Sequence, residues 1–470
     1  MGHLHVIGIG GTAMAGIAAL AQDAGWQVTG SDSGVYPPMS TFLAGRGIAV
    51  REGYRGENLD PAPDLVLVGN AISRGNPELE VVLDRGLPYR SGAEWLATHL
   101  LEGRHPVVVT GTHGKTTTSS LVAWLLECAG WGPGFLIGGI PRNFGEGTRF
   151  PRGPWVVVEG DEYDTAFFDK RPKFLHYRPR TLVVHNLEFD HADIYPDLEA
   201  IRRQFRLLLR TVPAKGLLLA NGDDPEVVGV VASAFGPVVY YGLEGDYPFS
   251  ARLNREDGSA FTLLREGRPL CEVAWELRGR HNVINAVAAG AVALSHGVSP
   301  KLVRQGLESF QGVARRLELK FRAGGISVYD DFAHHPTAIT TTLQGLKASL
   351  LPGGRLWVVL EPASNTMRRR VHQETLAAAL MVADRVVVAR PKPRGLSAAE
   401  LLDVDRVVGD ICRLRGEGAA AVVADAAEAV ALLGGGLCAG DQVVVMSNGG
   451  FDNIHGRLEK ELAGRGDHGG

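Results

Sequence analysis

The residues best suited to chemistry in this chain lie in the stretch VVVTGTHGKTTTSSLVAWLLEC, residues 107–128. It opens with a β-branched run typical of a buried strand, and the helix predicted from Lys115 carries its apolar residues on one face. A turn over 111–114 joins the two. Backbone N–H groups at a helix start attract anions, Lys115 adds a positive charge and the Thr116 hydroxyl can reach Mg²⁺. The stretch therefore predicts a phosphate-binding turn.

This turn matches the P-loop pattern G-x-x-x-x-G-K-[ST] only in part. Gly114, Lys115 and Thr116 occupy its last three positions, whereas Val109 stands where the pattern has its first glycine. The alternative is a helix N-terminus that begins with lysine by chance. The predicted strand before the turn and the predicted helix after it favour phosphate binding.

Polar side chains follow the next two predicted strands. Glu159 and Asp161 come directly after the strand at 155–158, and residues two apart on an extended chain face the same way. The strand at 181–185 leads into a second polar group, made of Asn186, Glu188, Asp190 and His191. Mg²⁺ binds carboxylates together with phosphate oxygens, so these strand ends predict metal sites beside the phosphate. The alternatives are a solvated acidic turn and a structural histidine.

A second glycine-rich turn joins a predicted strand and helix within the first 24 residues. Gly8, Gly10 and Ala13 fit the dinucleotide-binding pattern G-x-G-x-x-[GA]. Asp32 follows the next strand, where that pattern places an acid near the ribose. Because such a turn binds the diphosphate of many nucleotides, both NAD(P) and a nucleoside diphosphate conjugate are candidate ligands.

Two further groups suit ligand binding. Asn282 and Asn285 begin a predicted helix, and their amides suit an adenine edge as well as helix capping. Arg368, Arg369 and Arg370 form a basic cluster. Guanidinium groups bind carboxylates with paired hydrogen bonds, so the cluster predicts an anionic ligand, with a solvated turn as the alternative.

Strands and helices alternate along most of the chain, which predicts α/β domains built on doubly wound parallel sheets. A length of 470 residues suits about three domains. Hairpin signals over 236–276 predict an antiparallel appendage, and we expect helices over 371–383 and 397–415. The three expected domains are residues 1–103, 104–313 and 314–470.

Composition limits the possible partners. The formal net charge of −4 gives no general attraction to nucleic acid. The four cysteines are scattered without CxxC spacing, which favours reduced thiols in the cytoplasm and argues against a zinc site. No signal peptide is evident, and no apolar run is long enough to span a bilayer. We therefore expect a cytoplasmic protein that acts on small molecules, without nucleic-acid or membrane partners.

Six motifs follow one another along the chain: VTGTHGKTTT, EGDEYD, NLEFDHADIY, GRHNVINAVAA, GVARRLE and YDDFAHHPT. With them the chain resembles the Mur ligase family over essentially its whole length. The opening GIGGTAMAGIAAL is similar to the branch that takes UDP-N-acetylmuramate as its carboxylic acid. Other stretches, among them VYPPMS, DEYDTAFFDKRPKF and EPASNTM, resemble members that add a tripeptide rather than free L-alanine.

The resemblance implies a three-domain α/β architecture: a Rossmann-like domain for the UDP-sugar, a central P-loop ATPase domain and a Rossmann-like C-terminal domain for the amine. It implies that ATP and Mg²⁺ convert the carboxylate of UDP-N-acetylmuramate to an acyl phosphate. The amine of L-alanyl-γ-D-glutamyl-meso-diaminopimelate then attacks this intermediate, in recycling of cell-wall peptidoglycan that serves cell shape and division. Addition of L-alanine is the main alternative, and an NAD(P) dehydrogenase or a nucleotide-dependent switch is more distant.

The resemblance also implies roles for individual residues. Those expected to bind ATP are Gly111, Thr112, His113, Gly114, Lys115, Thr116, Thr117, Asn282, Asn285 and Arg316. Those expected to bind the UDP-sugar are Gly8, Gly10, Gly11, Thr12, Ala13, Asp32 and Ser73. Those expected to bind the peptide are Ser364, Asn365, Thr366 and Arg368. Magnesium is assigned to Thr116, Glu159 and His191, and catalysis to Lys115, His191, Asp331 and His334.

Two positions depart from the family pattern. Several relatives carry a carbamylated lysine after the N-x-x-x-D-H motif, but residues 192–214 contain no lysine, so we expect no carbamate. Ala363 stands where an arginine is expected, which leaves one peptide contact without its residue.

Overall fold

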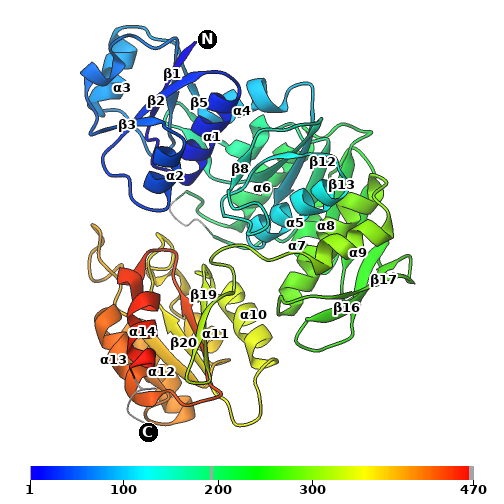
Figure 1. Ribbon diagram of the computed structural model, residues 1–470, viewed down its shortest axis with the longest axis vertical. Coiled ribbons are helices and arrows are strands. Elements are labelled where there is room, and N and C mark those ends of the chain that lie inside the picture. The colour runs from blue at the N-terminus through cyan, green and yellow to red at the C-terminus, as the bar shows by residue number, and fades with distance from the viewer. Residues whose placement is uncertain (1, 191–193, 465–470) are drawn as a thin grey trace.

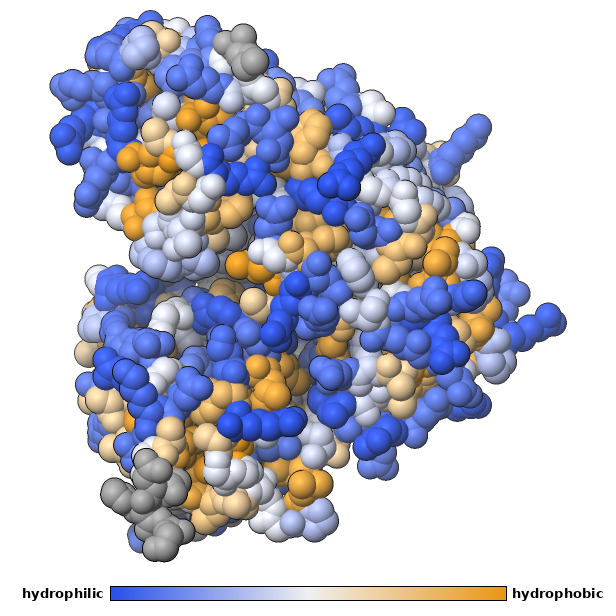
Figure 2. All heavy atoms as spheres, in the orientation of Figure 1, coloured by the Kyte–Doolittle hydropathy of each residue, from blue (hydrophilic) through white to orange (hydrophobic). Residues whose placement is uncertain are grey.

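The computed structural model describes residues 2–190 and 194–464, which form three α/β domains, each with its own sheet (Figure 1). In this view the N-terminal domain lies at the top left, the central domain at the right and the C-terminal domain at the bottom left. Figure 2 shows a notch on the left, where the N-terminal and C-terminal domains face each other. The arrangement agrees with the three α/β domains that the sequence predicts.

The N-terminal domain is built on a parallel sheet with strand order β3-β2-β1-β4-β5. β1 and β4 lie next to each other at the centre of this sheet, and from them the chain continues towards opposite edges. Open α/β sheets bind ligands at such a point, beyond the carboxyl ends of the strands. The strands are His3–Ile7 (β1), Gln27–Asp32 (β2), Ala49–Glu52 (β3), Leu65–Val68 (β4) and Tyr89–Ser91 (β5). The helices are Thr12–Asp23 (α1), Met39–Gly45 (α2), Pro77–Asp84 (α3) and Gly92–Leu96 (α4).

The central domain is built on a sheet with strand order β17-β16-β15-β14-β13-β12-β6-β9-β7-β8. β6 lies between β12 and β9 and is parallel to both, so the carboxyl ends of these three strands meet at one edge. The first four strands of this sheet in chain order are His105–Thr110 (β6), Gly134–Leu136 (β7), Thr148–Arg149 (β8) and Trp155–Gly160 (β9). A separate hairpin, Asp164–Ala166 (β10) and Asp169–Pro172 (β11), precedes a 3-10 turn at Lys173–His176.

The remaining strands of this sheet are Thr181–Val184 (β12), Leu217–Asn221 (β13), Val238–Gly242 (β14), Phe249–Leu253 (β15), Ala260–Arg265 (β16) and Arg268–Ala274 (β17). The helices are Lys115–Cys128 (α5), Leu198–Leu209 (α6), Pro225–Val231 (α7), Arg280–Ser295 (α8) and Pro300–Glu308 (α9). The appendage predicted over 236–276 is antiparallel only in its second half, because β14 and β15 continue the parallel part of the sheet. The prediction is wrong for the first half: α7 connects β13 to β14, which therefore pair in parallel, and β15 adds to β14 in the same direction.

The C-terminal domain is built on a sheet with strand order β18-β19-β23-β20-β21-β22, in which β18 is antiparallel to β19 and the other pairs are parallel. The strands are Glu318–Ala323 (β18), Ile326–Asp331 (β19), Leu356–Leu360 (β20), Arg385–Ala389 (β21), Ala420–Val423 (β22) and Gln442–Met446 (β23). The helices are Pro336–Lys347 (α10), Leu376–Leu380 (α11), Val404–Arg415 (α12), Ala426–Gly436 (α13) and Ile454–Ala463 (α14).

Two helices predicted in this domain are shorter than expected. The helix expected over 397–415 begins at Val404, because Asp403 caps it by accepting a hydrogen bond from the Arg406 backbone N–H at 3.0 Å. Within 371–383 only α11 is α-helical, and a 3-10 turn at Arg370–His372 precedes it. None of the helices in the described part of the chain is long and apolar enough to cross a membrane.

The N-terminal and central domains share one apolar core, whereas the C-terminal domain has clusters of its own. The shared core includes Leu20 of α1 and Leu136 of β7, which are both buried. Contacts between the central and C-terminal domains include polar ones, among them those of Arg316 and His335. The first two domains are therefore joined by apolar burial in a way that the third is not.

Candidate active site between the domains

The glycine turn after β6 wraps around the side chain of Lys115. Gly111 and Gly114 have φ values of +136° and +79°, and a Cβ atom on Gly114 would lie 2.7 Å from Oδ1 of Asn285. The Lys115 ammonium donates to the Gly111 carbonyl oxygen at 2.6 Å and to a Glu162 carboxylate oxygen at 3.0 Å. Although burial opposes it, the charge of Glu162 and its acidic neighbours raises the pKa of Lys115, so the ammonium stays charged.

The loop after β12 fixes the shape of this turn. Asn186 accepts a hydrogen bond from the His113 backbone N–H at 2.7 Å and donates one to the His113 carbonyl oxygen at 3.0 Å. The Thr112 hydroxyl accepts another from the Glu188 backbone N–H at 2.8 Å. From the sequence alone, Asn186 and Glu188 belong to a polar group at a strand end that predicts a metal site, not support of the turn. Their support of the turn depends on the pairing of β6 with β12, which the residue pattern does not reveal.

Thr116 and Glu159 bring oxygen atoms together at the start of α5. The Thr116 hydroxyl donates to one Glu159 carboxylate oxygen at 3.3 Å, and the Gly138 backbone N–H donates to the other at 2.7 Å. Burial, followed by the charge of Asp161, raises the pKa of Glu159 to about 7. Hydroxyl and carboxylate oxygens are ligands that Mg²⁺ prefers, so these two residues fit a magnesium site. His191, the third predicted ligand, lies outside the described residues.

Arg316 and Asp331 approach this site from the start of the C-terminal domain. The Arg316 guanidinium donates to the Thr116 hydroxyl at 3.2 Å, and it interacts electrostatically with Asp331. Asp331 accepts hydrogen bonds from the backbone N–H groups of Leu317 at 2.6 Å and Ala333 at 2.8 Å. Burial raises the pKa of Asp331 to about 6. The structure therefore brings both predicted residues to the phosphate-binding turn.

His334 lies in the loop between β19 and α10. Its Nδ1–H donates to the Phe332 carbonyl oxygen at 2.9 Å, so the lone pair of the neutral ring is on Nε2. Burial lowers the pKa of His334 to about 4, which keeps the ring neutral near pH 7. A neutral imidazole of this kind can accept a proton from a substrate.

Asn282 and Asn285 lie at the start of α8, beside the phosphate-binding turn. The Asn282 side chain donates to the Arg278 carbonyl oxygen at 2.7 Å, and Asn285 donates to Asn282 at 3.3 Å. The Thr118 hydroxyl of α5 donates to Asn285 at 3.1 Å. Gly279 is the N-cap residue of α8, so neither asparagine caps this helix.

The N-terminal glycine turn joins β1 to α1. Gly8, with φ +81°, donates its backbone N–H to the Ser31 carbonyl oxygen at 2.9 Å. Gly10 donates to the Asp32 carboxylate at 2.9 Å, and a Cβ atom on Gly10 would lie 2.9 Å from the same oxygen. The other predicted UDP-sugar residues lie at the start of α1 and on the loop after β4: Gly11, Thr12, Ala13 and Ser73.

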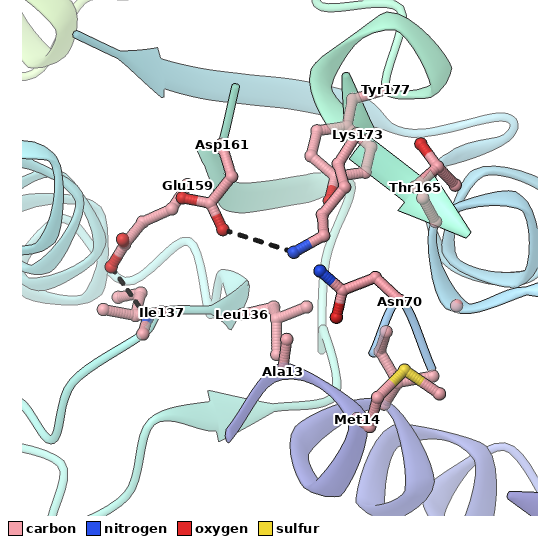
Figure 3. Close-up of a pocket in the computed structure, with 14 residues that line it drawn as sticks. Ala13, Met14, Asn70, Leu136, Ile137, Glu159, Asp161, Thr165, Lys173 and Tyr177 are labelled. Atoms are coloured by element: carbon pink, nitrogen blue, oxygen red, sulfur yellow. Dashed lines mark hydrogen bonds and ion pairs between the residues drawn. The ribbon is translucent and has the colours of Figure 1, made fainter. Parts of the chain in front are cut away.

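A pocket lies between the N-terminal and central domains, with Ala13 and Glu159 in its lining (Figure 3). The N-terminal domain contributes residues of α1, α4 and the loop after β4, and the central domain contributes residues near β7, β9 and the β10–β11 hairpin. Asn70 and Lys173 point towards each other across the pocket in Figure 3, and the Lys173 ammonium lies 3.8 Å from the Asp161 carboxylate. The pocket therefore connects a predicted UDP-sugar residue with a predicted metal ligand.

The predicted peptide-binding residues form a loop after β20. Arg368 is only 6% exposed, and its guanidinium donates to the Ser364 carbonyl oxygen at 3.2 Å and to the Asn365 side chain at 2.6 Å. Thr366 is buried beside them. The three arginines at 368–370 bind different partners within the domain, so they form neither a simple solvated turn nor one carboxylate-binding group.

Comparisons with known proteins identify the family. Three family descriptions match in succession: the Mur ligase family catalytic domain at residues 3–104, the Mur ligase middle domain at 109–293 and the Mur ligase glutamate ligase domain at 315–449. The chain belongs to the Mur ligase family.

Among Mur ligases, the chain is similar to a UDP-N-acetylmuramate–L-alanyl-γ-D-glutamyl-meso-2,6-diaminoheptandioate ligase of Haemophilus influenzae, with 43% identity over 98% of this chain and 99% of the relative. It is 35% identical to a UDP-N-acetylmuramate–L-alanine ligase of Rubrobacter xylanophilus, over 87% of this chain and 88% of that relative. The crystal structure of a murein peptide ligase from Psychrobacter arcticus matches with a TM-score of 0.75 and 40% identity, over 98% of this chain and 99% of that one. The predicted three-domain Mur ligase fold is confirmed, and the chain is an ATP-dependent ligase.

Proposed function

We propose that this Mur ligase joins UDP-N-acetylmuramate to L-alanyl-γ-D-glutamyl-meso-diaminopimelate while ATP is cleaved to ADP and phosphate. The relative named for this amine is 43% identical, whereas the relative named for L-alanine is 35% identical and matches less of the chain. The pocket between Ala13 and Glu159 carries the proposal. A sugar acid whose UDP lies on the N-terminal turn would place its carboxylate in this pocket, beside the γ-phosphate of ATP.

In the first proposed step, the sugar carboxylate attacks the γ-phosphate, an acyl phosphate forms and ADP leaves. Lys115, Arg316 and the backbone N–H groups of the turn offset the negative charge on the transferred group. Thr116 and Glu159 would bind Mg²⁺, which supplies further neutralisation of the phosphate charge. Lys173, on the pocket wall, attracts and orients the sugar carboxylate.

In the second proposed step, the peptide amine attacks the acyl carbon, the C–N bond forms and phosphate leaves. The amine must lose a proton, and Nε2 of His334 is our candidate acceptor because its ring is neutral. We place the peptide carboxylates at the loop of Ser364 and Arg368. Enclosure of the acyl phosphate by the three domains limits its hydrolysis.

We further propose that the enzyme works in the cytoplasm on small-molecule substrates and recycles cell-wall peptide. Its four cysteines are free thiols, which agrees with a reducing compartment. A magnesium requirement is tested by chelation. We expect EDTA to stop ADP formation and added Mg²⁺ to restore it.

Phosphate release with MgATP and UDP-N-acetylmuramate tests the choice of amine. We expect rapid release when the tripeptide is added and much slower release with L-alanine. Faster release with L-alanine would replace the proposal with the alanine-adding reaction. Release that needs neither the sugar nor an amine would favour a nucleotide-dependent switch, and NAD(P) bound at the N-terminal turn would favour a dehydrogenase.

A further inference from the structure

Imidazole and carboxylate groups of two domains meet beside the phosphate-binding turn. His113 lies in that turn, Glu188 in the loop after β12 and His335 at the N-cap of α10. Nε2 of His113 lies 3.2 Å from Oε2 of Glu188, and Nδ1 of His335 lies 3.3 Å from the same oxygen. Each of the three side chains offers a ligand atom such that all three atoms lie within 4.8 Å of one another.

These separations suit a small transition-metal ion. Zn²⁺ binds nitrogen and oxygen ligands at about 2.0–2.2 Å in a tetrahedron, so its ligand atoms are about 3.3–3.6 Å apart. The separations from Glu188 to the two histidines, 3.2 and 3.3 Å, are close to that range. Nδ1 of His335 also accepts a long hydrogen bond from the Thr337 backbone N–H at 3.3 Å, a contact that an ion can replace.

His372 lies beside the cluster and gives a second reason to expect a ligand here, although it is not one of the three residues whose ligand atoms lie close together. It lies in the 3-10 turn at 370–372, and its side chain is only 6% exposed. Among the residues that the structure describes, none forms a hydrogen bond with its Nε2. Its ring centre lies 4.7 Å from that of His335, with the ring planes at 83°. A buried polar atom of this kind is expected to have a partner.

We propose that His113, Glu188 and His335 bind a transition-metal ion of the Zn²⁺ class, with a water molecule as the fourth ligand. Two histidines and a glutamate are a ligand set that Zn²⁺ uses in other proteins, and a fourth ligand completes its tetrahedron. The spacing of the cysteines argues against a zinc site built from cysteine. It does not bear on this cluster, which contains no cysteine.

The proposed ion differs from the magnesium predicted nearby. Thr116 and Glu159 offer only oxygen atoms, which suit Mg²⁺. The new cluster offers imidazole nitrogens, which suit Zn²⁺, Co²⁺ or Ni²⁺ and not Mg²⁺. An excess of Mg²⁺ therefore fills the first site and leaves the second available.

The ion would connect two domains that share no apolar core among the residues that the structure describes. His113 and Glu188 belong to the central domain, and His335 belongs to the C-terminal domain. Bound metal therefore stabilises the arrangement in which these domains touch. Because Mur ligase substrates must enter and leave between domains, we expect Zn²⁺ at this site to slow turnover.

The test uses Co²⁺, whose visible absorption reports tetrahedral coordination, titrated into the full-length protein in excess Mg²⁺. His335→Gln and Glu188→Gln each remove one ligand, from two different elements. His455→Gln is the matched control, because within the described chain Nε2 of His455, like that of His372, has no hydrogen-bond partner, and this residue lies on α14 next to Asp330.

We expect the unmodified protein and His455→Gln to bind Co²⁺ equally, with Zn²⁺ displacing it and slowing turnover. Each ligand variant should bind at least ~10-fold more weakly and be less inhibited by Zn²⁺. Circular dichroism identifies the folded variants, and either ligand variant alone decides the outcome. If the unmodified protein gives no tetrahedral Co²⁺ band, or a folded ligand variant binds Co²⁺ as tightly, the proposal is overturned and the cluster is only a hydrogen-bonded contact between domains.

Discussion

Two glycine turns follow parallel strands in this protein, and their surroundings differ. The turn after β1 is held mainly by groups of the neighbouring strand β2: Gly8 donates to the Ser31 carbonyl oxygen, and Gly10 donates to the Asp32 carboxylate. The turn after β6 encloses Lys115, whose ammonium contacts a buried glutamate, and Arg316 approaches it from another domain. The first turn suits binding of a diphosphate that does not react, and the second suits transfer of a phosphoryl group.

A buried network behind the first turn extends this contrast. Glu78 of α3 is fully buried and accepts hydrogen bonds from Ser31 and Asn58, each at 2.9 Å. It also contacts Nε2 of His5 at 2.6 Å. Because the Ser31 carbonyl oxygen accepts from Gly8, the network supports the turn from behind. The first turn is thus supported by groups behind it, whereas the second is fixed by the loop after β12 and is surrounded by charged side chains.

Replacing Lys115 by Met should have the largest effect, and this effect should be confined to the second turn. We expect ADP formation to fall by about 10²–10³-fold or more, because one preorganised charge at the transferred group is lost. UDP-N-acetylmuramate should bind as before, which calorimetry measures. Because Lys115→Met removes the ion pair with the buried Glu162 carboxylate, the double variant Lys115→Met/Glu162→Gln controls for that charge. Lys170→Met, at an exposed lysine, is the control for lysine removal, and normal turnover in Lys115→Met would refute the phosphate assignment.

Replacing Glu78 by Ala should have the next largest effect and act on the first turn. The change leaves several buried donors without an acceptor, which costs about 1–3 kcal/mol of folding free energy. We expect a lower melting temperature and a higher KM for the UDP-sugar, with kcat little changed. Glu80→Ala on the same helix is the matched control, since Glu80 binds an exposed arginine. A loss of kcat with an unchanged KM would show that the network does not serve the first turn.

Alanine at Gly8 or at Gly114 compares the two turns directly. Both glycines have φ near +80°, where an L-residue is strained by about 1–2 kcal/mol. We expect Gly8→Ala to weaken UDP-sugar binding about tenfold and Gly114→Ala to weaken ATP binding about tenfold. Calorimetry with each ligand on each variant gives four affinities. If either variant loses both ligands equally, the two turns do not act separately.

The smallest predicted effect is an acid sensitivity of the central domain. Burial, with smaller contributions from His296 and Arg180, lowers the pKa of His105 to about 4. Between pH 6.5 and 4 the unfolded chain binds a proton that the folded state does not, so stability falls as the pH falls. After allowance for solvent screening, we expect the free energy of unfolding to fall by about 1 kcal/mol between pH 7 and pH 5, and the melting temperature to fall by about 2–4 °C. His105→Gln should reduce this dependence, and an equal pH dependence in that variant would contradict the assignment.

Local patterns predict one part of this site and tertiary contacts determine the rest. The strand, turn and helix over 107–128 form as expected, because β-branched residues, glycines and an amphipathic helix occur in that order. Glu159 can be singled out in the sequence because it comes at the end of a predicted strand. The sequence does not predict that Glu162 pairs with Lys115 or that Asn186 supports the turn, because each contact joins segments that follow different strands of the sheet.

The helix boundaries show the same limit. The start of α12 is set by Asp403, a cap that competes with helix-favouring residues from 397 onwards. Arg316 is identified by family resemblance alone, and its contact with Thr116, 200 residues away, needs the domains to be assembled. His372 has no signal in the sequence, since the lack of a hydrogen-bond partner for its Nε2 among the described residues is visible only in the folded protein.

Oxygen transfer tests the central claim, that the second turn delivers a phosphoryl group to a sugar acid bound at the first. UDP-N-acetylmuramate labelled with ¹⁸O in its carboxylate is incubated with MgATP, the tripeptide and the enzyme, and the released phosphate is analysed by mass spectrometry. Because the carboxylate attacks the γ-phosphate and the amine then displaces phosphate, we predict that each phosphate carries a single ¹⁸O from the sugar. Phosphate released without ¹⁸O while the amide forms would contradict the account.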